Sequence, residues 1–142
     1  MIRGWLVVTL ATGCIDAIAP EVGPLQSSGE ATCNADTDPG TIVPYADVQQ
    51  LFDDRCTRCH RPGGEGVQDS GLDLTSYDVL LAGGTRSVAT IAIPGEPCAS
   101  VLFQKLTEAP PFGARMPRGD RDLSTAELQL VHDWISEGAL AP

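Results

Sequence analysis

The stretch Cys56-Thr57-Arg58-Cys59-His60 places two thiols three positions apart and an imidazole directly after the second thiol. Three positions are about one turn at the end of a helix, so both sulfur atoms reach one side of the chain and the imidazole projects between them. This C-x-x-C-H pattern is the attachment sequence for c-type haem, in which the thiols bond to the porphyrin and the imidazole binds the iron. The stretch therefore predicts one covalent haem on Cys56 and Cys59, with His60 as the proximal iron ligand.

Other sites that contain a C-x-x-C pair fit the sequence less well. A structural zinc site needs four ligands, but the chain has no second C-x-x-C and no H-x₃₋₅-H. A thioredoxin-like dithiol belongs in a βαβ pattern and needs no histidine after its second cysteine. Chance would produce C-x-x-C-H in only on the order of a few per thousand chains of this composition.

The composition indicates one small acidic domain. The 142 residues are 42% hydrophobic and 5% aromatic, which provides a modest core that a buried haem would enlarge. The formal net charge of −10 argues against a nucleic-acid partner, because phosphate binding requires basic patches. An acidic surface would suit a basic docking partner, although solvation alone explains the acidity equally well.

The N-terminal residues are typical of an exported protein. Residues 1–13 combine Arg3 with a compact apolar run that is too short to span a bilayer, as in a short secretory signal. The run Leu10-Ala11-Thr12-Gly13-Cys14 resembles the lipobox of bacterial lipoproteins, with leucine one place further from the cysteine than is usual. We therefore expect a lipoprotein anchored through lipid on Cys14, in the periplasm or on the outer surface of a bacterial membrane. An ordinary signal cleavage nearby is the alternative.

Residues 14–41 have the composition of a linker. They contain Pro20, Pro24 and Pro39 among small polar residues, with no hydrophobic period over any useful length. We expect them to form a flexible, lipid-anchored tether, followed by one domain over residues 42–142.

Hydrophobic spacing predicts several short helices in that domain. Val48, Leu51 and Phe52 recur at helical spacing within residues 44–59, which predicts a helix that leads into the haem motif. The glycines and proline of residues 62–66 predict a loop. Further short helices are expected from an N-cap at Thr75 and over residues 99–107. A loop rich in proline and glycine follows, over residues 108–122, and it contains Met116.

The last helix has the clearest boundaries. Ser124-Thr125-Ala126-Glu127 is a capping box, and Gly138 marks the end of the helix. His132 lies on this helix beside the charged Asp133, so we expect an exposed or boundary histidine there.

This order of parts resembles that of a class I c-type cytochrome. Several phrases more closely resemble the planctomycete-type cytochrome c lipoproteins, namely Gly71-Leu72-Asp73-Leu74, Ile93-Pro94-Gly95-Glu96, Arg115-Met116-Pro117, and Leu123-Ser124 leading to Trp134-Ile135. The resemblance covers residues 42–141. It implies an all-α, small class I cytochrome c fold, with three to five short helices wrapped around one covalent haem.

The resemblance also implies that Met116 is the distal iron ligand, opposite His60. If Met1 leaves with the signal, Met116 is the only thioether in the mature chain, and its loop offers little core. A lone methionine is otherwise more often a filler of the core. His132 is the other candidate for the sixth ligand, and an exposed position makes it the weaker one.

Other residues take expected roles from the same resemblance. Phe52 and Trp134 match aromatic positions where the first and last helices cross over the haem. Arg86, Arg115 and Arg118 are candidates to pair with the haem propionates, although most arginines in such loops face water.

The expected function is one-electron transfer and not catalysis, because iron with both axial positions filled has no open site for a substrate. The expected partners are redox proteins that dock weakly near the exposed haem edge, and we expect a monomer. A five-coordinate haem that senses a gas or reacts like a peroxidase is the alternative, in which Met116 does not bind iron.

The cysteine count leaves one pair over. Of five cysteines, Cys14 is assigned to lipid and two to haem, so Cys33 and Cys98 remain. Export to an oxidising compartment predicts a disulfide between them, which would pin the end of the linker against the domain. Unpaired thiols or bonds between molecules are the alternative.

Overall fold

The computed structural model describes residues 33–119 and 122–142. The described residues contain no strand, and the predicted all-α class is confirmed. The elements are α2 (Tyr45–Arg55), α3 (Glu65–Ser70), α4 (Tyr77–Ala82), the 3₁₀ helix η1 (Pro97–Ala99), α5 (Val101–Gln104) and α6 (Thr125–Ser136). The predicted signal (1–13), Cys14 and the linker as far as residue 32 lie outside the described residues.

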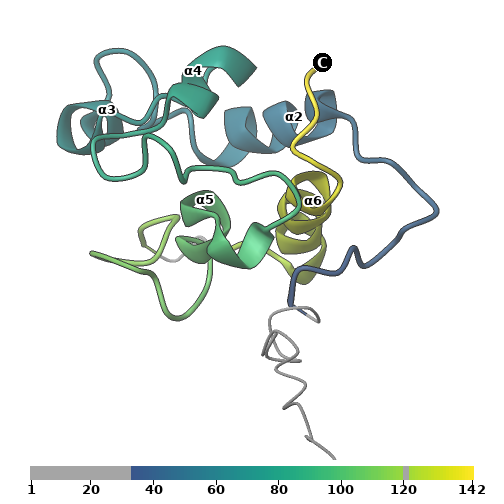
Figure 1. Ribbon diagram of the computed structural model, residues 1–142. Helices are drawn as coiled ribbons and strands as arrows, with labels where there is room; N and C mark the ends of the chain where they lie inside the picture. Colours follow the sequence, from purple (N-terminus) through teal and green to yellow (C-terminus); the bar gives the residue numbers. More distant parts are fainter. Residues whose placement is uncertain (1–32, 120–121) are drawn as a thin grey trace, which may run out of the picture.

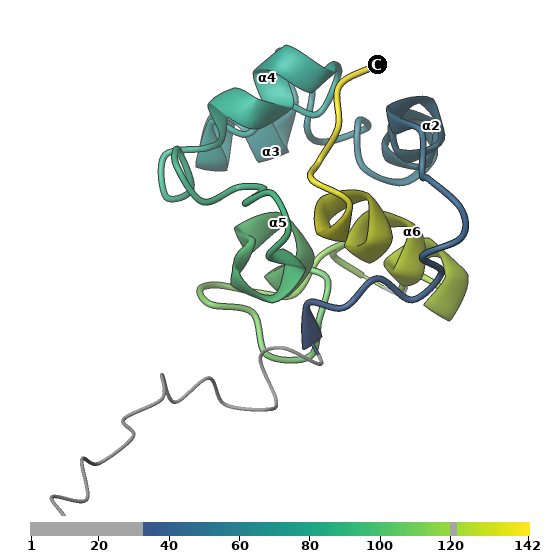
Figure 2. The same cartoon turned by 45° about the vertical axis from the view of Figure 1, so that its right-hand side comes forward.

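Helix α6 is the centre of the arrangement. It packs against α2, α5 and η1, while α3 and α4 lie together above α5 in both views (Figures 1 and 2). The predicted capping box is present: Ser124 Oγ accepts the N–H of Glu127, and the Glu127 carboxylate accepts the N–H of Ser124. Val131, Trp134 and Ile135 on the inner face of α6 are fully buried.

Aromatic side chains join three of the helices. Tyr45 of α2 lies 5.6 Å from the ring of Trp134 in α6 and 5.1 Å from the ring of Tyr77 in α4, measured between ring centroids. The Trp134 Nε1–H donates to the carbonyl of Leu140, and the Tyr77 hydroxyl donates to that of Ala139. Both polar tips are therefore satisfied by the C-terminal residues, so the cluster can be buried at little cost.

Three predicted boundaries are wrong. The expected N-cap at Thr75 is instead Ser76, because the Thr75 hydroxyl donates to Asp73. The helix expected over 99–107 is divided into η1 and a single turn, α5. Helix α3, which starts inside the loop expected over 62–66, was not predicted.

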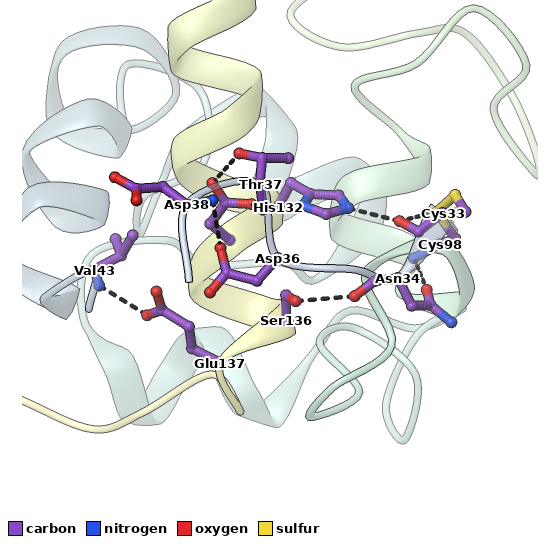
Figure 3. A network of polar contacts seen from close by, with 11 residues as sticks. Cys33, Asn34, Asp36, Thr37, Asp38, Val43, Cys98, His132, Ser136 and Glu137 are labelled. Atoms are coloured by element: carbon purple, nitrogen blue, oxygen red, sulfur yellow. Dashed lines mark hydrogen bonds and ion pairs between the residues drawn. A yellow bond between two sulfur atoms is a disulfide. The ribbon is translucent and has the colours of Figure 1, made fainter. Parts of the chain in front are cut away.

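Residues 33–38, here called the N-terminal segment, lie along α6 (Figure 3). Thr37 donates its backbone N–H and its hydroxyl to the carboxylate of Asp133. The Ser136 hydroxyl donates to the carbonyl of Asn34 at 2.9 Å. We expected this segment to belong to a flexible linker. In the structure it is hydrogen-bonded to Asp133 and Ser136 of α6, which lie 96 and 102 residues away from their partners in the sequence.

His132 is buried, so the expectation of an exposed or boundary position is wrong. Its Nε2 lies 2.7 Å from the carbonyl oxygen of Cys33 and its Nδ1 lies 2.8 Å from the carboxylate of Asp133. Phe103 packs edge-on against the ring. Each ring nitrogen therefore has an oxygen atom within hydrogen-bond distance. Both nitrogens are engaged, and His132 is therefore not available as an iron ligand.

The Asp133 carboxylate is held in its ionised form. Burial by itself would raise the pKa of Asp133, but the hydrogen bonds from Thr37 and His132 outweigh burial and keep the pKa below its ordinary value. The polar contacts between the N-terminal segment and α6 therefore include a charged acceptor, which makes them stronger than contacts between neutral groups.

The predicted disulfide between Cys33 and Cys98 is present. It connects the N-terminal segment to η1, across a sequence separation of 65 residues. Cys56 and Cys59 are the free cysteines of the described chain.

Removing the disulfide by Cys33→Ser with Cys98→Ser will lower the free energy of unfolding by about 4 kcal/mol, since a loop of this length loses much chain entropy when closed. Urea unfolding of the haem-loaded protein measures the change. Wild-type protein reduced with a dithiol is the control and should match the variant. Equal midpoints for the variant and the oxidised wild type would contradict the expectation.

Candidate haem site

A cavity of about 440 Å³ opens between the end of α2, helix α3, helix α5 and the loop that follows α5. All four residues predicted for the site, Cys56, Cys59, His60 and Met116, line it. Its apolar walls are formed by Phe52, Leu72, Leu74, Ile91, Val101, Leu102 and Leu106. A cavity of this size with mainly apolar walls is typical of a cofactor site.

The haem motif folds into consecutive turns directly after α2. The helix ends at Arg55, and the N–H groups of Cys59 and His60 both donate to the carbonyl of Cys56 at 3.0 Å. These turns bring both thiols and the imidazole to the cavity. Cys56 is half-buried, and burial raises the pKa of its thiol to about 11, whereas Cys59 is exposed. The motif thus reaches from the interior to the surface.

One backbone contact fixes the orientation of the His60 ring. Its Nδ1 lies 3.0 Å from the carbonyl oxygen of Leu72. Because a carbonyl can only accept, Nδ1 carries the hydrogen, and the lone pair of Nε2 is left to bind a metal. The N–H of Leu74 donates to the carbonyl of His60 at 2.9 Å, so the same short segment holds the backbone as well.

Helix α3 packs against the other side of the His60 imidazole. A Cβ atom on Gly66 would lie 2.8 Å from Cε1 and from Nδ1 of His60, and 2.9 Å from the carbonyl oxygen of Cys59. The Gly66 N–H donates to that same carbonyl. Sequence reasoning missed this residue, because a glycine inside a helix points to a packing contact only when the helix itself has been predicted.

Met116 reaches the cavity from a different wall. It is half-buried and packs against the core, and its N–H donates to the carbonyl of Lys105 at 2.7 Å. In Figure 1 the loop after α5, which carries Met116, lies below α5, whereas α3 lies above it. Phe52 also lines the cavity as expected, while Trp134 belongs to the aromatic cluster with Tyr45 and Tyr77.

Positive charge is concentrated at the cavity. Five of the nine basic residues line it, Arg55, Arg58, Arg86, Lys105 and Arg118, together with the acidic Glu65 and Asp69. Arg86 and Arg118, two candidates for the propionates, are thus placed at the site. Arg115, the third, is engaged elsewhere, because its guanidinium pairs with Glu108 and its Nε donates to the carbonyl of Leu106.

The donor set fits a haem and does not fit a bare metal ion. Two thiols, an imidazole with Nε2 free, a thioether, apolar walls and cations for carboxylates all meet in one cavity. Across residues 33–119 and 122–142, no group of three or more His, Cys, Asp or Glu side chains could hold a metal ion. A structural zinc site would require four such ligands.

The comparison with known families agrees with this geometry. The cytochrome c family model matches residues 45–138, which is more than half of the chain and includes the motif, the cavity walls and Met116. No curated protein and no solved structure matches the chain significantly. Domains of this family carry haem c bound covalently, and a single haem is usual for a domain this small. The chain therefore belongs to the cytochrome c family, as a class I c-type cytochrome that binds haem and transfers electrons.

Proposed function

We propose that the protein is a monohaem electron carrier whose iron is bound by His60 and Met116. The observation that carries the proposal is that the free Nε2 of His60 and the thioether of Met116 belong to different walls of the cavity bordered by Cys56 and Cys59. A bound haem would supply a one-electron Fe(III)/Fe(II) couple.

The residues would tune this couple in a definite direction. A thioether ligand favours Fe(II) and raises the reduction potential, and the apolar walls disfavour the additional charge of Fe(III). If His60 and Met116 both bound the iron, no position on it would remain for a substrate. This supports a carrier in preference to an enzyme, in agreement with the general role of the family.

We place the site of electron exchange at Cys59. This residue is the exposed end of the haem motif and borders a second, more open hollow, whose charged lining residues are Arg58, Arg61, Arg118 and Glu65. A redox partner would meet positive charge there, although the chain as a whole carries −10. The partner's contact patch would then be acidic, in contrast to the basic partner expected from net charge.

We also propose that the protein is an exported lipoprotein of the planctomycete type. Cytochrome c domains are typically exported, and within the described residues no helix is both long and apolar enough to cross a membrane. Lipid on Cys14 would then provide the anchor. The domain end of the tether is the N-terminal segment, which enters below α6 in Figure 1, whereas α3 and α4 lie at the top.

Substituting Met116→Ala will leave the haem covalently attached and open the sixth position. The reduced variant should bind carbon monoxide readily, whereas the wild type should bind it poorly because Met116 must first leave. Leu106→Ala, which truncates an apolar wall of the same cavity without removing a ligand, is the matched control and should behave as the wild type. Equal carbon monoxide affinity in wild type and Met116→Ala would show that Met116 is not the ligand and would favour a five-coordinate haem.

Substituting Gly66→Ala will displace the His60 ring and destabilise the protein by about 1–3 kcal/mol, since the added methyl group overpacks a tight contact. Urea unfolding gives the stability, and the proton NMR signals of the His60 ring in the reduced, haem-loaded protein report the orientation of the ring. Gly40→Ala is the control, because its Cβ would meet only a carboxylate oxygen at 3.6 Å. An unchanged spectrum and midpoint for Gly66→Ala would contradict this seating of His60.

Mass spectrometry of the mature N-terminus will find a diacylated or triacylated Cys14. Cys14→Ser should release the protein from the membrane fraction without changing its haem content, because that residue is outside the haem-binding domain. A mature protein that starts at any other residue, or that carries no lipid, would refute the anchor.

A further inference from the structure

The side chain of Lys105, the residue that follows α5, lies across the loop that carries Met116. Its Nζ donates to the carbonyl oxygen of Phe112 at 2.6 Å and to the carbonyl oxygen of Ala114. The same ammonium lies 5.1 Å from the centroid of the Phe112 ring. The backbone carbonyl of Lys105 accepts the N–H of Met116. One residue therefore contacts every second residue of the loop from 112 to 116.

The loop lacks regular secondary structure that would fix its conformation. Residues 108–119 contain no helix or strand, and prolines at 110, 111 and 117 remove backbone donors that could build internal turns. An ammonium has three donors, and hydrogen bonds from a charged donor are stronger than those between neutral groups. Lys105 satisfies two loop carbonyls with these donors and uses the ring of Phe112 for a cation–π contact.

The hydrogen bonds to the loop carbonyls replace the hydration that the Lys105 ammonium loses on burial. Burial lowers the pKa of Lys105, and the nearby positive charge of Arg118 lowers it further. Among the described residues, no carboxylate forms a salt bridge with Lys105. The loop carbonyls are therefore the acceptors that stabilise this charge, and the ammonium and the loop hold each other in place.

We propose that Lys105 is a positioning residue that holds the loop so that Met116 closes the sixth position of the iron. The proposal rests on ligation by His60 and Met116. Arg115, the residue before Met116, also holds this loop: its Nε donates to the carbonyl of Leu106, and its guanidinium pairs with Glu108. Lys105 also lines the cavity, so the competing role is a simple charge partner for a haem propionate.

Carbon monoxide binding separates these roles, because the gas competes with Met116 for the sixth position. Its apparent affinity scales with the fraction of molecules in which that position is open. Lys105→Met keeps a long side chain but removes every donor, and we expect carbon monoxide to bind about ten-fold more tightly to the reduced variant. Lys105→Arg keeps charge and donors, and should stay near the wild type. Arg86→Met is the matched control, because it removes the other cation over the Phe112 ring and leaves both carbonyl bonds intact.

The double variant distinguishes failure of this proposal from failure of the ligand assignment. If Met116→Ala opens the site and Lys105→Met adds nothing to it in the double variant, Lys105 acts through Met116. If Met116→Ala opens the site but Lys105→Met alone binds carbon monoxide like the wild type, or no more tightly than Arg86→Met, the positioning role is wrong. If Met116→Ala itself changes nothing, the ligand assignment has failed.

A second measurement avoids any folding defect of the variants. Lys105 is the only lysine in the chain, so reductive dimethylation of purified, haem-loaded protein modifies this side chain and the N-terminal amine if that is free. Dimethyl-lysine keeps its charge but has a single N–H, which cannot serve both carbonyls. Tighter carbon monoxide binding after dimethylation supports the positioning role, whereas unchanged binding overturns it, because a propionate partner would keep its charge.

Discussion

The hydrogen bond from Nδ1 of His60 to the carbonyl of Leu72 determines which ring nitrogen remains free for iron. The rest of the proximal side supports this one contact. Segment 72–74 also holds the His60 backbone. Gly66 has no side chain, so the space that a methyl group would occupy is left for the His60 ring. The orientation of the imidazole is thus set by backbone groups and by the absence of a side chain, and it does not depend on a charged partner.

The distal side is built differently, because its ligand lies on a loop without secondary structure of its own. That loop depends on α5, and α5 packs on α6 next to η1. The disulfide joins η1 to the N-terminal segment, which is itself bound to Asp133 and Ser136 of α6 (Figure 3). Helices α6 and η1 therefore support both the loop that carries Met116 and the N-terminal segment.

Local signals predicted the parts of the molecule that depend on local chemistry. The capping box, helix α2, the covalent motif and the pairing of Cys33 with Cys98 could be found from residue types and spacing, and the structure contains each of them. Helix α3 and Gly66 could not, because a glycine there is explained only by its contact with the His60 ring. The burial of His132 was missed for a similar reason, since the group that covers it, Cys33, lies 99 residues away in the sequence.

The most direct test of iron ligation by Met116 is the methyl resonance of this residue in the reduced, haem-loaded wild type. With methionine methyl groups isotopically labelled, the proton spectrum contains at most two such signals, because the chain has two methionines. A methyl group on a thioether bound to iron lies over the porphyrin, where the ring current shifts its protons far upfield. Ligation by Met116 predicts one methionine methyl signal upfield of all other methyl signals in the protein. A Met116 methyl signal at its ordinary position would contradict it.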